Sequence, residues 1–411
     1  MTSAAARTAL VLTADLPVAG LEDFYRDLHR NPELSLQEHR TAAKLSERLA
    51  KAGYETAEGI GGTGVAGLLR NGDGPVVLLR ADMDALPVQE ETGLPYASEV
   101  PGVMHACGHD LHMTWLAGAA EALAGGRDAW SGTLLVVGQP AEETGQGAAR
   151  MIADGLYERF VRPDVLLGQH AAPGPVGFYA HSPGLIMSAS TDLDIVVHGT
   201  GGHGSRPETT VDPVVTAAYL VTRLQTVVSR EIAARESAVL TVGRIEAGTR
   251  HNIIPSKACI SLNLRTQSDE VRERMIAAIR RIAAGEALAA GCPREPEVTV
   301  GATFPVTMND AGTDRRIAAV HEEVLGAGTV LDFGPVMGSE DFPYLAQGQI
   351  PYSYWFVTTT PAEVWDAAPG NELMEKFLAV PSNHSPRFGP DLSTITPGVR
   401  TLVSAALAYL A

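Results

Sequence analysis

Residues 133–143 read Thr-Leu-Leu-Val-Val-Gly-Gln-Pro-Ala-Glu-Glu, a short apolar run that ends in a proline and two adjacent carboxylates. A continuous apolar run of this length is typical of a strand buried on both faces. Similar runs alternate with helical stretches along this part of the chain. Strands are expected at Val76–Leu79, Thr133–Val137 and Val165–Leu167, and helices at Leu111–Leu123 and Ala148–Asp154. This alternation predicts an α/β fold with a mixed, mostly parallel sheet between helices.

The N-terminal region is less regular. Leu21–Ala52 has a helical pattern that Asn31-Pro32 divides in two, because proline interrupts a helix. Before it, Asp15 ends a short apolar run, and we expect residues 1–15 to form an irregular tail. The glycine-rich stretch Gly59–Gly67 lacks the Lys-Ser/Thr pair that contacts phosphate, so we interpret it as a turn between strands.

The hydrophobic pattern changes near Ser188. Thr191–His198 alternates, with Leu193, Ile195 and Val197 on one face, as in a strand with one buried side. A helix opening at Asp212-Pro213 follows, then strands near 238–245 and 258–266, a helix near 271–282 and a strand near Val298. This β-α-β-β-α-β order predicts a small α+β sandwich of the ferredoxin-like kind. We therefore expect residues 189–303 to be a domain inserted into a larger, discontinuous domain of residues 1–188 and 304–411.

The composition narrows the classes of function. The 411 residues carry 31 Lys and Arg against 48 Asp and Glu, a net charge of −17. Such an acidic surface repels nucleic acids and anionic membranes, and we expect neither as a partner. Three cysteines are too few for a disulfide framework, and no apolar run approaches the ~18 residues of a membrane-spanning helix. We expect a soluble protein of a reducing compartment, the cytoplasm.

The densest group of chemically useful residues is the run His105-Ala106-Cys107-Gly108-His109-Asp110-Leu111-His112. It lies after a Pro-Gly turn and before a predicted helix. Cys107 and His109 are two residues apart, so in extended backbone their side chains fall on one side and could share a metal. A buried structural cysteine among surface histidines is the alternative, but glycine-flanked Cys-x-His packs poorly and suits a metal site.

Further donor groups follow other strands of the same predicted domain. Glu142 and Glu143 come after Thr133–Val137, His170 follows Val165–Leu167, and His384 lies in a C-terminal loop. Ligand sites of α/β sheets lie at the carboxyl ends of the strands. In extended backbone, one of the two glutamates could bind a metal while the other acts as a general base, and spacing does not say which. These donors are sufficient for two bridged divalent ions.

Five motifs in order resemble the M20 metallopeptidase family, and specifically its amidohydrolase branch of aminoacylases, hippurate hydrolases and plant auxin-conjugate hydrolases. They are Arg80–Pro87, Cys107–Asp110, Gln139–Glu143, Asn252–Pro255 and Met337–Phe342. The resemblance implies a catalytic domain with two metal ions and an inserted lid domain. Through the lid, subunits would form a homodimer or a dimer-based tetramer.

The resemblance also implies roles for individual residues. The metal ligands are Cys107, His109, Glu143, His170 and His384. Glu142 is the general base, and a histidine corresponding to His203 reaches the partner subunit's active site to stabilise the oxyanion. Asn252 and Arg265 match lid positions that hold the substrate. The thiolate and imidazoles suit Zn, Ni or Co, and the carboxylates admit Mn.

The activity implied is hydrolysis of the amide bond of N-acyl amino acids, by attack of a metal-bridging water with Glu142 as base. The products are a carboxylic acid and an amino acid. A dipeptidase or carboxypeptidase of the same superfamily is the nearest alternative. A metal-binding protein without turnover and a nucleotide-dependent α/β enzyme are more distant ones.

Overall fold

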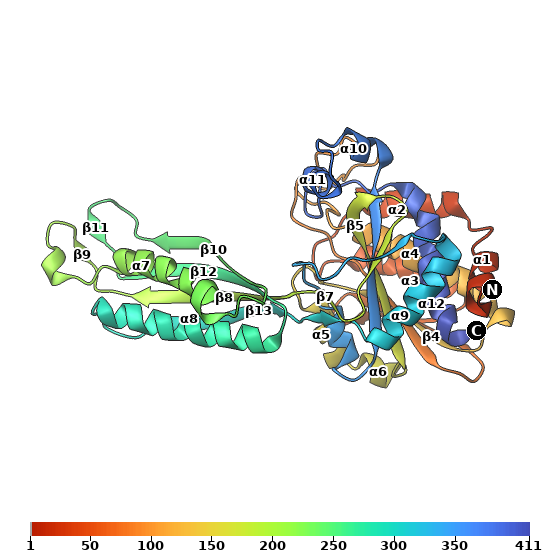
Figure 1. The fold of residues 1–411 in the computed structure, drawn as a ribbon, viewed down its shortest axis with the longest axis horizontal. Coiled ribbons are helices and arrows are strands. Elements are labelled where there is room, and N and C mark those ends of the chain that lie inside the picture. The colour runs from red at the N-terminus through yellow and green to blue at the C-terminus, as the bar shows by residue number, and fades with distance from the viewer. Residues whose placement is uncertain (1) are drawn as a thin grey trace. The chain divides into compact units, whose positions relative to one another are not determined.

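A mixed sheet of eight strands brings the predicted strands of residues 76–82, 132–139 and 165–175 side by side in the computed structural model, which describes residues 2–411 (Figure 1). Its order is β1 (Glu55–Ile60), β2 (Gly64–Asn71), β4 (Gly132–Gln139), β3 (Val76–Asp82), β5 (Val165–Pro175), β16 (Tyr352–Thr360), β6 (Tyr179–His181) and β15 (Val330–Asp332). The pairs β4–β3, β3–β5, β5–β16 and β6–β15 are parallel, and the other three are antiparallel. The predicted fold class is confirmed.

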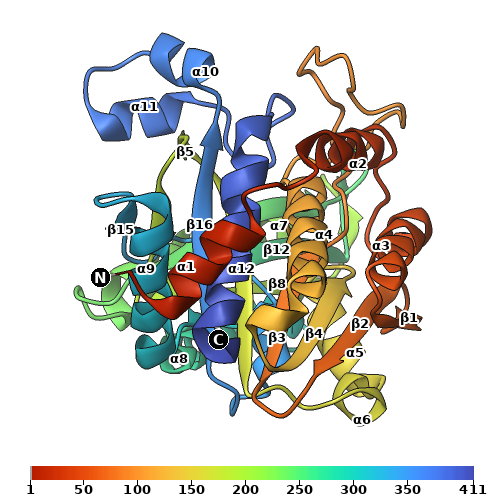
Figure 2. The same ribbon diagram turned by 90° about the vertical axis from the view of Figure 1, so that its right-hand side faces the viewer.

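Helices cover this sheet. Long helices α4 and α12 lie over the central strands, as Figure 2 shows, and α5 lies on the other side. The helices of this unit are α1 (Ala4–Leu12), α2 (Val18–Arg30), α3 (His39–Lys51), α4 (His109–Gly125), α5 (Gly147–Ala153), α6 (Leu156–Arg159), α9 (Ala311–Leu325), α10 (Ala362–Ala367), α11 (Leu373–Ala379) and α12 (Ile395–Leu410). Short 3₁₀ turns are η1 (Arg127–Ala129), η4 (Phe342–Ala346) and η5 (Leu392–Thr394).

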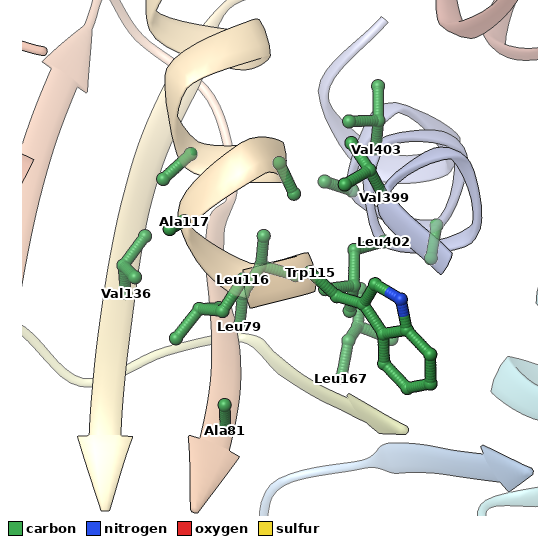
Figure 3. Close-up of a cluster of buried hydrophobic side chains, with 14 of the residues drawn as sticks. Leu79, Ala81, Trp115, Leu116, Ala117, Val136, Leu167, Val399, Leu402 and Val403 are labelled. Carbon is green, nitrogen blue, oxygen red and sulfur yellow. The ribbon is translucent and has the colours of Figure 1, made fainter. Parts of the chain in front are cut away.

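The main hydrophobic core lies between α4, α12 and the sheet (Figure 3). Trp115 of α4 is fully buried, and its indole N–H donates to the Thr394 carbonyl over 3.0 Å. Gly398 lets α12 approach closely, because a Cβ there would lie 2.3 Å from the indole nitrogen. The core therefore fixes α4, whose first residue is His109.

The N-terminal prediction is partly wrong. Asn31-Pro32 does separate two helices, α2 and α3, and Gly61–Thr63 is the turn between β1 and β2. Residues 4–12, however, form helix α1 instead of a tail. Ser3 caps it by accepting from the Ala6 N–H, and Ala5, Ala6 and Ala9 are buried against α9 and α12. The short alanine-rich sequence gave too weak a periodic signal for a helix that tertiary packing stabilises.

A second unit comprises Met187–Thr307 and Pro335–Glu340. Its sheet has the order β10 (Ala238–Ala247), β12 (Lys257–Thr266), β8 (Ala189–His198) and β13 (Glu297–Phe304), all antiparallel. Helices α7 (Pro213–Thr226) and α8 (Asp269–Ala289) pack on one face. The remaining elements are β9 (Gly202–His203), β11 (Ile253–Ile254), η2 (Pro207–Thr209) and the π-helical turn η3 (Val227–Glu231). The chain order β-α-β-β-α-β and the sheet order give the expected ferredoxin-like arrangement.

The division of the chain adds one segment to the small unit. Sequence analysis placed Pro335–Glu340 in the larger domain, whereas in the structure this segment belongs to the smaller unit. Strands β7 (Leu185–Met187) and β14 (Thr307–Met308) lie where the chain passes between units. Within residues 2–411 no helix is both long enough and apolar enough to cross a membrane.

Candidate metal centre and active site

The carboxyl ends of neighbouring parallel strands build the floor of the candidate site. Asp82 is the last residue of β3 and pairs in register with Gln139, the last residue of β4. The buried guanidinium of Arg80 joins them, at 2.7 Å from Asp82 Oδ2 and 2.9 Å from Gln139 Oε1. A buried cation with two such partners fixes the positions of both strand ends.

Cys107 and His109 come together by a turn, so our expectation of extended backbone there is wrong. Cys107 lies in the turn, and Gly108 has a φ of +86°, the left-handed conformation that favours glycine. A Cβ on Gly108 would also lie 3.1 Å from the Ala171 Cβ. His109 then begins α4. Ligand atoms of Cys107, His109 and Glu143 all lie within 4.8 Å of one another, as the predicted metal site requires.

Glu142 and Glu143 also lie in a turn, where extended backbone was expected. The Gly145 N–H donates to the Glu142 carbonyl over 2.8 Å. Asp84 accepts the Glu142 amide at Oδ1 over 3.1 Å and the Glu143 amide at Oδ2 over 3.0 Å. One buried carboxylate thus holds the backbone of both glutamates.

The last two predicted ligands complete the cluster. His170 Nδ1 donates to the Ala171 carbonyl over 2.7 Å, which leaves the Nε2 lone pair 3.6 Å from Cys107 Sγ. His384 Nε2 lies 3.4 Å from Glu143 Oε1, and its φ of +68° is rare outside glycine. The structure therefore brings all five predicted ligands together in the larger unit.

The charges at this cluster fit divalent cations. Asp82, Asp84, Glu142 and Glu143 each place an oxygen within 4.0 Å of a His109 ring nitrogen. Burial opposes a charged His109 ring, but the carboxylates of Asp82 and Asp84 outweigh it and raise the pKa of His109 to about 10. This excess of negative charge in a buried site is what metal ions offset.

The hydrogen bonds of this cluster also indicate a site for metal ions. Within residues 2–411, both ring nitrogens of His109 and Oε1 of Glu143 are buried without a hydrogen-bond partner. Burial, with the neighbouring Glu143 and Glu142 carboxylates, raises the pKa of the Cys107 thiol well above its usual range. A thiol here becomes a ligand only when a cation compensates its charge. The donor set of thiolate, imidazole and carboxylate suits such ions.

His112 lies beside the cluster but has no nitrogen left for a metal. Its Nδ1 donates to Asp82 Oδ1 over 2.6 Å, and its Nε2 accepts the Ala171 N–H over 2.8 Å. Burial lowers the pKa of His112 to about 4, which keeps the ring neutral. His112 therefore orients Asp82 and the strand that carries His170.

Asn383 is a residue that sequence analysis did not single out. Its side-chain amide donates to the carbonyls of Cys107 and Ala171 over 3.2 and 3.1 Å. It thereby joins the loop of His384 to two other segments of the cluster. Its place next to His384 was a usable signal, whereas nothing in the sequence indicated its partners.

The three predicted lid residues lie in the smaller unit. His203 and Asn252 are close, because β9 pairs with β11 and the Gly204 N–H donates to the Asn252 carbonyl over 2.9 Å. The Ser205 N–H donates to His203 Nδ1, so the proton of the neutral ring is on Nε2. Arg265 lies apart from them on β12, where its guanidinium donates to Ser339 Oγ over 2.8 Å and to the Met337 carbonyl.

Comparison with known proteins identifies the family to which this chain belongs. Residues 78–375 match the peptidase family M20/M25/M40. The chain belongs to this family. A hippurate hydrolase of Campylobacter jejuni is 40% identical over 329 residues, which are 79% of this chain and 85% of the relative.

Two further similar proteins are a metal-binding peptidase of known structure and a carboxypeptidase. The crystal structure of the Bacillus subtilis YXEP protein, a dinuclear metal-binding peptidase of the M20 family, aligns with a TM-score of 0.76, 30% identity, and 95% and 97% of the two chains. Thermostable carboxypeptidase 2 of Saccharolobus solfataricus is 35% identical over 378 residues, 91% of each chain. The predicted family, its amidohydrolase branch and metal binding are confirmed.

Proposed function

We propose that this M20 enzyme hydrolyses the amide bond of N-acyl amino acids, with Glu142 as general base. The observation that carries the proposal is the convergence of Cys107, His109, Glu143, His170 and His384 around unpaired ring nitrogens, with Glu142 in the same turn. The similarity to a hippurate hydrolase supports the substrate class, because hippurate is itself an N-acyl amino acid.

The five ligands would hold two divalent ions, with Zn, Mn, Ni or Co as the candidates. Bound there, the ions lower the pKa of water and polarise the scissile carbonyl. Glu142 takes a proton from the attacking water and delivers it to the departing amine nitrogen. Asp84 keeps the Glu142 and Glu143 backbone amides in place while this happens.

The smaller unit would complete the site as a lid. His203 carries its proton on Nε2 when neutral and is exposed, which suits donation to a developing oxyanion. Asn252 and Arg265 supply polar groups for the substrate carboxylate or acyl end. In this scheme His203 acts on the active site of the partner subunit.

A homodimer through the smaller unit, or a tetramer of such dimers, is part of the proposal. Strand β10 is at the edge of its sheet, and Val239 and Ile245 on it are 42% and 54% exposed. Val215 and Tyr219 of α7 are 52% and 66% exposed. An unpaired strand edge and exposed apolar side chains favour association with another subunit.

Location in the cytoplasm is also part of the proposal. All three cysteines are free thiols, which agrees with the reducing conditions of the cytoplasm.

A panel assay tests the activity. Amine release is measured with Nα-acetyl, Nα-benzoyl and Nε-acyl-lysine amino acids, first on metal-free protein and then with Zn²⁺, Mn²⁺, Co²⁺ or Ni²⁺. We expect metal-dependent release from at least one of them. If protein that binds two ions releases nothing from any of them, the N-acyl amino acid assignment is wrong.

A carboxypeptidase is the second candidate, supported by the similarity to thermostable carboxypeptidase 2. Dipeptides and blocked peptides in the same assay separate the two candidates. A higher kcat/KM for peptides than for acyl amino acids would favour the carboxypeptidase.

A further inference from the structure

Glu38 is a buried carboxylate that the proposed mechanism does not use. It immediately precedes α3, and its side chain is fully buried. Oε1 accepts the Ala141 N–H over 2.8 Å, and Oε2 accepts the Thr63 hydroxyl. The carboxylate therefore joins three segments that are distant in sequence: the start of α3, the β1–β2 turn and the turn that carries Glu142 and Glu143.

Ala141 has an unusual backbone conformation. Its φ is +48°, in the left-handed region that a residue with a Cβ enters only at a cost. Ala141 is fully buried, so its N–H has no access to water. Its carbonyl accepts the Gln146 and Gly147 N–H groups over 3.3 and 3.2 Å. Glu38 supplies the acceptor for the N–H, and without it a buried donor would be unpaired.

The conformation of Ala141 determines where the next two side chains point. Glu142 follows it directly, and Glu143 Oε1 lies 3.8 Å from His109 and 3.4 Å from His384. Asp84 fixes the amides of Glu142 and Glu143, and Glu38 fixes the amide before them. Consecutive amides at 141, 142 and 143 are thus held by two buried carboxylates.

The segment before Glu38 supports the same arrangement. Ser35 donates to Asp84 Oδ2 over 2.6 Å, and the Ala85 N–H donates to the Glu33 carbonyl over 2.8 Å. Leu36 has a φ of +63°, a second left-handed residue close in sequence to Glu38. The short connection between α2 and α3 that follows Asn31-Pro32 thus reaches both carboxylates that hold the glutamate turn.

We propose that Glu38 is a positioning residue: by accepting the Ala141 N–H it stabilises the left-handed turn that presents Glu142 and Glu143 to the metal centre. The inference rests on the proposed roles of those two glutamates. The position requires reach, meaning a side chain long enough to bring an acceptor oxygen to the Ala141 N–H. It does not require charge, because the partner is a neutral amide.

A pair of substitutions separates reach from charge. Glu38→Gln keeps an acceptor at the same distance and removes the charge, while Glu38→Asp keeps the charge and retracts the acceptor by one methylene. We expect E38Q to keep kcat within about 3-fold of wild type and E38D to lower kcat by about 10–100-fold, with a smaller change in KM. Thr63→Val is the matched control, because it removes the other hydrogen bond of the same carboxylate. We expect T63V to keep its kcat.

Two measurements do not depend on catalysis. Hydrogen exchange of the peptide covering residues 140–147 and the affinity for Zn²⁺ are measured on each variant. We expect faster exchange and weaker binding in E38D but not in E38Q or T63V. Ala141→Gly should restore part of the loss in E38D, because glycine adopts a positive φ without strain.

The proposal is overturned if E38D matches T63V in exchange, metal affinity and kcat, or if E38Q is as impaired as E38D. If the wild-type protein hydrolyses no acyl amino acid, the proposed function fails while exchange and metal affinity still decide the role of Glu38. If E38D does not fold, E38Q alone decides: loss of its metal affinity or faster exchange at 140–147 would refute the role of reach.

Discussion

Two of the buried clusters of histidine and carboxylate in the larger unit differ in whether all their histidine ring nitrogens have hydrogen-bond partners. One is the metal centre around His109. The other joins β6 to α9: His181 Nδ1 lies 2.9 Å from Asp314 Oδ1, and His181 Nε2 lies 3.0 Å from His321 Nδ1. His321 Nε2 donates to the Thr401 carbonyl over 3.0 Å.

In the second cluster every ring nitrogen has a partner. Burial lowers the pKa of His321 well below its usual value, so its ring is neutral. Because His321 Nε2 donates to Thr401, its Nδ1 accepts the hydrogen bond from His181 Nε2. Among the described residues only Asp314 Oδ2 has no partner there, whereas His109 has neither nitrogen bonded. Residue types alone would suggest a site in both places. Buried ring nitrogens without a hydrogen-bond partner distinguish the metal centre from the structural cluster.

The largest expected effect lies at the metal centre. Glu142→Gln removes the base but keeps the size of the side chain. We expect kcat to fall by about 10²–10⁴-fold while two ions stay bound, because Glu143 and the other ligands are intact. Amine release and metal analysis of the purified variant measure the two quantities. Activity close to wild type would exclude Glu142 as the base.

A smaller effect is expected from Asp84→Asn. The carboxylate accepts two backbone amides, and an amide side chain offers an oxygen to only one of them. We expect metal affinity to fall by about 10–100-fold with the fold retained, as for other residues that orient ligands. Competition with a chelator measures the affinity. Unchanged affinity would mean that the turn holds without Asp84.

The second cluster should respond in stability alone. His321→Leu leaves the buried His181 Nε2 donor without a partner and removes one of the hydrogen bonds that the Thr401 carbonyl accepts, and we expect a loss of about 1–3 kcal/mol in the free energy of unfolding. Metal content and kcat should stay at the wild-type values. Chemical denaturation and metal analysis test this, and loss of bound metal would break the distinction between the clusters.

A further expected effect concerns the pH dependence of stability. His29 lies 2.6 Å from Asp110 and 3.3 Å from Glu90. Burial opposes its charge, but hydrogen bonds and Coulombic attraction to these carboxylates raise the pKa of His29 to about 9, from the usual 6.5. Because the folded-state pKa is the higher one, this stabilisation is complete below about pH 6.5 and is lost as the pH rises through about 9.

The test is the free energy of unfolding of the wild type and of His29→Gln, measured from pH 6 to pH 10. The variant should be less stable at the acid end, and the difference should shrink toward pH 10. A difference that does not change with pH would mean that His29 is neutral in the folded protein.

Much of the fold and of the candidate site could be predicted from the sequence, because the sequence signals were periodic or local. The apolar runs at 76–79, 133–137 and 165–167 became β3, β4 and β5, and the alternation from Thr191 became β8. Asp212 caps α7 as expected, accepting the Val214 N–H. The five proposed ligands were singled out by their residue types, and two of them, Glu143 and His170, also by their positions after strands.

The sequence did not indicate the backbone conformation at the site or the hydrogen bonds between distant segments. We expected extended backbone at Cys107–His109 and Glu142–Glu143, and both are turns. The left-handed φ of Ala141 is not encoded by alanine itself, and the acceptor of its N–H is Glu38, far earlier in the chain. Choosing Glu143 over Glu142 as ligand came from the family, since both carboxylates lie near His109.

The segment Pro335–Glu340 has a consequence for how the chain is made. It belongs to the smaller unit, and Met337 and Ser339 accept hydrogen bonds from Arg265. A ribosome delivers residues in order, at roughly 5–20 per second. The Arg265 contacts therefore cannot form until residues 308–340 have been synthesised. The smaller unit is thus not complete when residues 187–307 alone have been made. For the same reason, a fragment ending at Thr307 lacks part of the unit it is meant to isolate.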